Sequence, residues 1–244
     1  MAIPATEAKT PYSAIVLGAT GNVGSRIVQL LIESPLCGKV TVVTRRKTGA
    51  FTDPKVSEVV VNMDRLEEEL APHARGVDIA LAAFGVGKGT AKLSDEELRK
   101  IEVGYPRDFC RAAKAGGARV GAVMTAAGAD PASRVRYARF IGEKEKAAEA
   151  VGFDFLGLYR PSVILGNSNT PGLLGWAMRP LGWVMPSSKI RAIHKNDLAR
   201  AMVAQSEQAF AALWLGGVPG KATVKILEYK EMRPFFVKGE SGRA

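Results

Sequence analysis

Short apolar runs of strand length alternate along the chain with longer segments whose apolar residues recur every three or four positions. The short runs predict strands near residues 13–17, 39–44, 56–61, 77–84, 119–124 and 153–159. The longer segments predict helices near residues 22–33, 94–115, 135–151 and 196–210. Because the predicted strands are apolar on both faces, the pattern indicates an α/β fold: a doubly wound parallel sheet with helices on both faces.

A glycine-rich loop, GATGNVG, separates the first predicted strand from the first predicted helix. In this context Gly18 would turn off the strand, Gly21 would let a pyrophosphate approach the backbone, and Gly24 would let the helix pack closely. N–H groups of the first helical turn would then face the ligand. The loop therefore predicts a Rossmann-like dinucleotide-binding domain, with a glycine turn that binds nothing as the alternative. The candidate cofactor-binding residues here are Gly18, Thr20, Gly21, Asn22, Val23 and Gly24.

Two arginines follow the second predicted strand. A domain that selects NAD normally carries an acidic residue at this strand end, which accepts a hydrogen bond from the ribose 2′-hydroxyl, whereas arginine accommodates the 2′-phosphate of NADP. The strand ends in Thr44, and Arg45 and Arg46 come next without an Asp or Glu. The sequence therefore favours NADP(H) over NAD(H), and a solvated basic turn is the alternative.

The composition fits one domain. The chain has 244 residues, of which 47% are hydrophobic and 24% charged. We divide it into a polar leader (residues 1–12), a Rossmann-like core (13–160), a small C-terminal substrate-side region that completes the fold (161–229) and a basic tail (230–244). Two histidines are too few for a histidine-built metal site, so we expect no metal.

The cysteines and the N-terminal segment bear on the compartment. Cys37 and Cys110 lie in segments that we predict as helical, and they match no zinc spacing, so we expect buried thiols. The leader has no apolar core and a single lysine, which is typical of neither a signal peptide nor a transit peptide. No apolar run is long enough to span a bilayer. We expect an intracellular protein, cytoplasmic by default, with the mitochondrion as the alternative.

The net charge of +10 is unusual. A basic protein attracts anions in general, including phosphorylated cofactors, nucleic acids and acidic protein partners. Positive residues gather at 45–47, at 134–139 and in the tail, without the interleaved aromatic residues that stack on bases. We therefore do not expect nucleic-acid binding, and we consider an acidic partner or a larger assembly, contacted through the basic surface and the tail.

The helix predicted at 94–115 carries recognisable end signals. Ser94 and Glu97 form a capping-box pattern at its start. Gly116 and Gly117 follow its last residue and provide a natural stop.

Beyond these signals, the chain resembles the atypical short-chain dehydrogenase/reductase superfamily, and within it the Tat-interacting oxidoreductase family and its NmrA-like relatives. The likeness runs from about residue 13 to residue 204 and is carried by VLGATGNVG, VTVVTRRK, GADPASRVRYARFIGEKE, LYRPSVILG and AIHKNDLARAM. It implies that Asn62 and Met63 meet the adenine and that Ala82, Ala83 and Phe84 line the cofactor's ribose. It also implies that Thr125 orients a substrate carbonyl and that Tyr137 donates a proton.

One position departs from the family's pattern. The family's tyrosine is followed four residues later by a lysine, and Ile141 takes that place here. The lysine would lie on the same helix face, lower the pKa of the tyrosine and hold the ribose hydroxyls, and isoleucine does neither. Lys144 lies about two turns, or roughly 10 Å, along the helix from Tyr137. It is a poor substitute, although Tyr137 could still act as a neutral acid.

Two functions therefore stay open. The first is NADP(H)-dependent reduction of a small carbonyl substrate, with Thr125 and Tyr137 as catalytic residues. The second is non-catalytic cofactor binding, as a regulator or as an accessory subunit of a larger complex such as a mitochondrial one, and it is motivated by Ile141 and the basic tail. Nucleic-acid binding ranks behind both.

Overall fold

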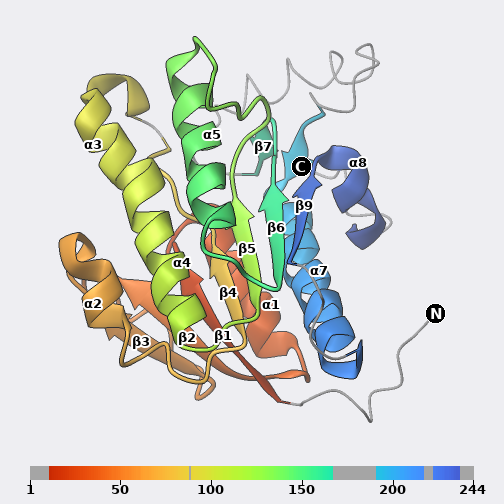
Figure 1. Ribbon diagram of the computed structural model, residues 1–244. Coiled ribbons are helices and arrows are strands. Elements are labelled where there is room, and N and C mark those ends of the chain that lie inside the picture. Colours follow the sequence, from red (N-terminus) through yellow and green to blue (C-terminus); the bar gives the residue numbers. More distant parts are fainter. Residues whose placement is uncertain (1–10, 88, 167–190, 217–221, 237–244) are drawn as a thin grey trace.

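Seven parallel strands form the central sheet of the computed structural model, which describes residues 11–87, 89–166, 191–216 and 222–236 (Figure 1). The strand order is β3-β2-β1-β4-β5-β6-β9, so the direction of winding reverses between β1 and β4. The strands are β1 (Tyr12–Leu17), β2 (Cys37–Thr44), β3 (Val56–Val60), β4 (Ile79–Ala82), β5 (Val120–Met124), β6 (Phe155–Tyr159) and β9 (Thr223–Leu227). A second, two-stranded parallel sheet pairs β7 (Ile164–Leu165) with β8 (Ile193–His194).

Helices cover both faces of the sheet. On one face α1 (Asn22–Glu33) and α7 (Lys195–Gly216) pack side by side, and on the other lie α2 (Leu66–Leu70), α4 (Tyr105–Ala115) and α5 (Arg136–Glu149) (Figure 1). Each face has its own core cluster, one around Ile27 and Met202 and the other around Phe109. The predicted α/β doubly wound fold is confirmed.

The helix predicted at 94–115 consists of three consecutive segments. The segments are α3 (Asp95–Arg99), a single π-helical turn (Lys100–Gly104) and α4. The predicted capping box is present, because Glu97 N donates to Ser94 Oγ at 3.1 Å and Ser94 N donates to Glu97 Oε2 at 2.8 Å. The wider π turn buries Glu102, a charged residue that regular amphipathic spacing does not reveal.

Two expectations about local structure differ from what the structure has, and one strand was missed. Cys37 is not helical but begins β2, because α1 ends at Glu33 and only three residues link it to the strand. The strand predicted at 77–84 is paired as β4 only over Ile79–Ala82. Strand β9 was not predicted, since it is an edge strand whose first four residues are exposed and lack apolar continuity. Cys37 and Cys110 are both buried thiols, as expected.

The C-terminal region is described in part. Of the predicted substrate-side region, residues 167–190 and 217–221 lie outside the described residues, as do residues 1–10 of the leader and 237–244 of the tail. Phe235 and Phe236 pack against the core cluster on the α7 face. The rings of Phe236 and Tyr229 pack edge to face, with their centroids 5.5 Å apart. Within the described ranges, no helix has the length and apolar character needed to cross a membrane.

The capping box gives a test of this local structure. We expect Ser94→Ala to lower the free energy of unfolding by about 1 kcal/mol, because the Glu97 amide loses its acceptor. Ser94→Thr keeps the hydroxyl and should retain most of that stability. Urea unfolding measures both, and equal losses in the two variants would contradict a capping role for the hydroxyl.

Candidate functional site

The glycine loop turns sharply at the carboxyl edge of the sheet. Gly18 has φ +84°, and a Cβ on it would lie 2.4 Å from Ala83 O. A Cβ on Gly24 would lie 2.0 Å from Gly18 O, and Gly21 N donates to that same oxygen at 2.9 Å. Only glycine fits at Gly18 and Gly24, so the loop brings the start of α1 against both β1 and the end of β4.

The start of α1 has the properties of an anion-binding helix end. No side chain caps it and its first turn carries no acidic residue. Thr20 and Gly21 are exposed beside it, whereas Val23 points into the core. The first N–H groups of a helix lack intrahelical acceptors and the helix dipole favours negative charge there, so these residues fit a pyrophosphate.

The basic residues after β2 lie at the same edge of the sheet. Arg45 and Arg46 are exposed and directly follow Thr44, the last residue of β2. Burial and the hydrogen bond to Asp64 raise the pKa of the Tyr105 phenol, whereas the charges of Lys100 and Arg45 lower it. The charge of Arg45 therefore acts at Tyr105, the first residue of α4.

Asn62, one of the two residues expected on the adenine side, is linked to Tyr105 through Asp64. The side chain of Asn62 accepts from Asp64 N at 3.0 Å, and Met63 is buried. Tyr105 Oη donates to Asp64 Oδ1 at 2.8 Å. The rings of Tyr105 and Phe84 pack edge to face, with their centroids 6.2 Å apart. Sequence reasoning missed Tyr105, although an aromatic residue at the start of a helix on this edge was an available signal.

The residues expected on the ribose side lie at and just after the end of β4, where Ala83 and Phe84 contact Gly18 of the glycine loop. Ala82 and Ala83 are buried at the end of β4, and Phe84 is half-buried. The ammonium group of Lys144 donates to Phe84 O at 2.7 Å. Lys144 is thus engaged with the protein backbone.

Thr125 lies at the end of β5 in a buried polar network. Its hydroxyl is 2.8 Å from Glu145 Oε1 and 3.1 Å from Tyr159 O. Glu145 is itself held by Arg160 through two hydrogen bonds, of 2.8 and 2.5 Å. A hydroxyl has one hydrogen, and both neighbouring oxygens compete for it. Sequence reasoning missed Glu145, whose burial on α5 depends on the partners that β5 and β6 bring to it.

Tyr137 lies in the first turn of α5 with its side chain 42% exposed. Desolvation and then the charge of Glu102 raise the pKa of its phenol. Ile141 is buried and apolar, and Lys144 is used elsewhere, so neither supplies a cation to the phenol. No hydrogen bond within the described part of the chain joins Thr125 to Tyr137, and the phenol stays neutral well above physiological pH.

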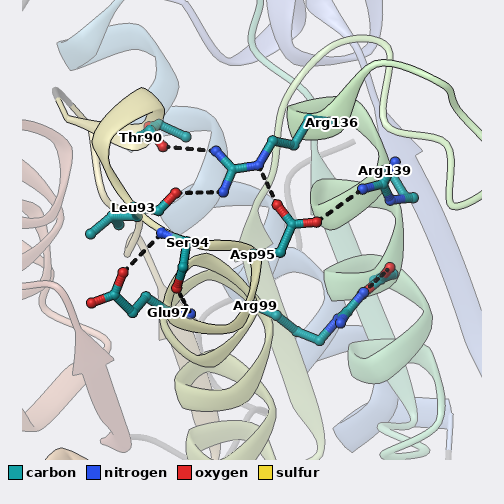
Figure 2. Close-up of polar contacts among 9 residues, drawn as sticks. Thr90, Leu93, Ser94, Asp95, Glu97, Arg99, Arg136 and Arg139 are labelled. Atoms are coloured by element: carbon teal, nitrogen blue, oxygen red, sulfur yellow. Dashed lines mark hydrogen bonds and ion pairs between the residues drawn. The ribbon is translucent and has the colours of Figure 1, made fainter.

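The arginines that flank Tyr137 tie α5 to the segment before α3 (Figure 2). Arg136 donates to Asp95 Oδ1, Thr90 O and Leu93 O at 2.6, 3.1 and 2.6 Å. Arg139 approaches the other Asp95 oxygen at 3.5 Å. The donors of Arg136 therefore serve the fold, so this arginine is not available to the acidic partner considered for the basic surface.

The close approach at Gly18 gives a second test. We expect Gly18→Ala to destabilise the protein far more than Gly152→Ala. Both glycines have positive φ, which costs alanine about 1–2 kcal/mol, but only the Cβ at position 18 meets a backbone oxygen, while position 152 has open space. Urea unfolding of the two variants checks this, and equal losses would refute the role of the contact with Ala83.

Comparison with known proteins agrees with this geometry. A protein family described as NAD(P)H-binding matches residues 18–152. Protein FMP52, mitochondrial, of Candida albicans is 32% identical over 165 residues, covering 67% of this chain and 72% of its own length. Protein HTATIP2 of Rattus norvegicus is 28% identical over 178 residues, covering 72% of each.

Solved structures share the fold. A short-chain dehydrogenase from Burkholderia cenocepacia in complex with NADP has a TM-score of 0.63 at 14% identity, covering 92% of this chain and 91% of its own. The enzyme WbmH of Bordetella bronchiseptica in complex with NAD+ has a TM-score of 0.61 at 15% identity, with 88% and 86% covered. The fold, the glycine loop and the sequence relatives agree: this chain belongs to the NAD(P)H-binding family of atypical short-chain dehydrogenases/reductases.

Proposed function

We propose that this protein binds NADP(H) at the carboxyl edge of its sheet, where β1 and β4 meet. The observation that carries the proposal is the glycine loop, in which Gly18 and Gly24 leave no room for side chains beside an uncapped, acid-free start of α1. Backbone N–H groups there hold the pyrophosphate. Asn62, Met63 and Tyr105 flank the adenine, and Ala82, Ala83 and Phe84 flank the nicotinamide ribose.

The preference for NADP(H) rests on Arg45 and Arg46. Both are exposed directly after β2, and residues 44–47 of that strand end include no Asp or Glu. Guanidinium groups bind phosphate through paired, charge-assisted hydrogen bonds. The 2′-phosphate of NADP(H) is the group that they fit.

The chemistry on the substrate side is slow reduction of a small carbonyl compound. The nicotinamide cofactor supplies the hydride when it is bound. Tyr137 donates the proton as a neutral phenol, since its pKa is raised and no lysine assists it. Thr125 contributes its hydroxyl only when the hydrogen turns away from Glu145 and Tyr159 O.

The second candidate is a cofactor-binding protein without catalytic turnover, acting as a regulator or as an accessory subunit. The observation that favours it is Ile141, a buried apolar residue at the family's lysine position. Several relatives are named mitochondrial proteins, which supports a mitochondrial location for this chain. The net charge of +10 suits an acidic protein partner.

Cofactor selectivity can be tested at the strand-end arginines. We expect the double variant Arg45→Ser/Arg46→Ser to lose about tenfold or more in NADPH affinity, while NADH affinity changes less than about twofold. Lys39→Ser, which removes an exposed positive charge near the opposite end of β2, is the matched control. Fluorescence titration measures each dissociation constant, and parallel losses for NADPH and NADH would contradict 2′-phosphate recognition.

Turnover separates the two candidate functions. We expect the protein to oxidise NADPH slowly with small carbonyl substrates, and Tyr137→Phe to be about 100-fold slower at unchanged NADPH affinity, because the proton donor is lost. NADPH absorbance follows the reaction. Equal rates in the two proteins would remove Tyr137 from the mechanism. Absence of turnover across a carbonyl panel, with NADPH bound, would establish the non-catalytic candidate.

A further inference from the structure

The segment that leaves β4 carries backbone groups that have no partner in the sheet, on residues Phe84 and Val86, which are half-buried. Ala83 N still donates to Leu17 O at 3.0 Å, but the ladder of β4 ends at Ala82. Beyond it, Phe84 O and Val86 N need other partners, because buried backbone polar groups are costly to leave unpaired. Two charged side chains from neighbouring helical segments provide them.

Lys144 of α5 and Glu102 of the π turn hold the two ends of this segment. Lys144 Nζ donates to Phe84 O at 2.7 Å, and Val86 N donates to Glu102 Oε1 at 2.7 Å. The ammonium and the second carboxylate oxygen lie 3.5 Å apart, and the two side chains are only 2% and 1% exposed. Gly85 packs against the Glu102 carboxylate, since a Cβ on it would lie 3.1 Å from Glu102 Oε1.

The charges are not needed to fill space. A buried ion pair contributes little net stability, because its desolvation offsets its attraction, and apolar side chains of similar volume often do as well. Desolvation lowers the pKa of Lys144 here, and the Glu102 carboxylate opposes that change. What an apolar pair would not supply is a donor for Phe84 O and an acceptor for Val86 N. The specific effect of the pair is therefore on the position of the segment 84–86.

That position matters to the glycine loop. A Cβ built on Gly18 would lie 3.2 Å from Phe84 Cα, so the segment and the loop are in contact. The ring of Phe84 also meets Tyr105, on the adenine side. A shift of Phe84 would therefore disturb both the glycine loop and Tyr105 on the adenine side of the proposed dinucleotide site.

We propose that Lys144 and Glu102 are positioning residues for dinucleotide binding, which they serve by holding the segment 84–86 against the glycine loop. The inference rests on the proposed function. Ile141 leaves the cofactor's ribose without the family's lysine, and Lys144 acts one turn further along α5 on the protein itself, at Phe84 O. Loss of either charge leaves its partner buried and unpaired, which lowers stability, and loss of the backbone contact at Phe84 O or Val86 N weakens NADP(H) binding in addition.

The test compares NADPH affinity with stability in matched variants. Lys144→Met keeps the volume and removes the donor to Phe84 O, and we expect it to raise the NADPH dissociation constant about tenfold or more. The emission of bound NADPH should also change, because the nicotinamide side of the site moves. Asp154→Asn is the control: it weakens a partly buried ion-pair group with Lys114 and Arg119 at the opposite edge of the sheet. It should lower the urea midpoint and leave NADPH affinity within about twofold of wild type.

A second variant covers the case in which Lys144→Met fails to fold. Gly85→Ala presses a methyl group on the Glu102 carboxylate without burying an unpaired charge, and its backbone is not in the left-handed region. It too should weaken NADPH binding, by about threefold or more. Loss of stability in either variant at unchanged NADPH affinity and emission would overturn the positioning role. A wild-type protein that does not bind NADPH would overturn the proposed function, and this inference with it.

Discussion

Three backbone segments meet closely at the carboxyl edge of the sheet, and the rest of the site depends on that contact. The Gly18 carbonyl occupies the place of a Cβ on Gly24, and the Ala83 carbonyl occupies that of a Cβ on Gly18. With no side chains between them, β1, α1 and the end of β4 surround one short turn. A ligand bound there would contact backbone groups and a helix dipole, which are the groups that suit a pyrophosphate.

The backbone groups that follow β4 lack partners in the sheet. A strand that ends inside the molecule leaves N–H and C=O groups that need partners, and here they belong to Phe84 and Val86. Lys144 of α5 and Glu102 of the π turn before α4, both buried, provide these partners. Further along, Arg136 binds the carbonyls of Thr90 and Leu93 (Figure 2). Lys144 and Arg136 of α5 thus hold the segment between β4 and α3 through backbone carbonyls of that segment.

The same helix carries Tyr137, the proton donor of the proposed reduction. A tyrosine that donates a proton efficiently has a cation beside it. At the position where the family has a lysine this chain has the buried Ile141, and Lys144 donates to Phe84 O. The hydroxyl of Thr125 is similarly engaged by the Glu145–Arg160 pair. Within the described residues, neither Ile141 nor Lys144 offers Tyr137 a cation, and the Thr125 hydroxyl is hydrogen-bonded inside the protein.

The sequence by itself determined the fold class and the tight glycine loop, because both depend on local signals: apolar periodicity and glycine spacing. It also placed the capping box at Ser94, since a cap is satisfied within four residues. Only the tertiary structure decided what Lys144, Glu102 and Glu145 do. Their partners lie 15 to 60 residues away and are brought together by the sheet. A buried charge acquires its role from the groups it meets across the fold, and periodicity within its own helix does not record them.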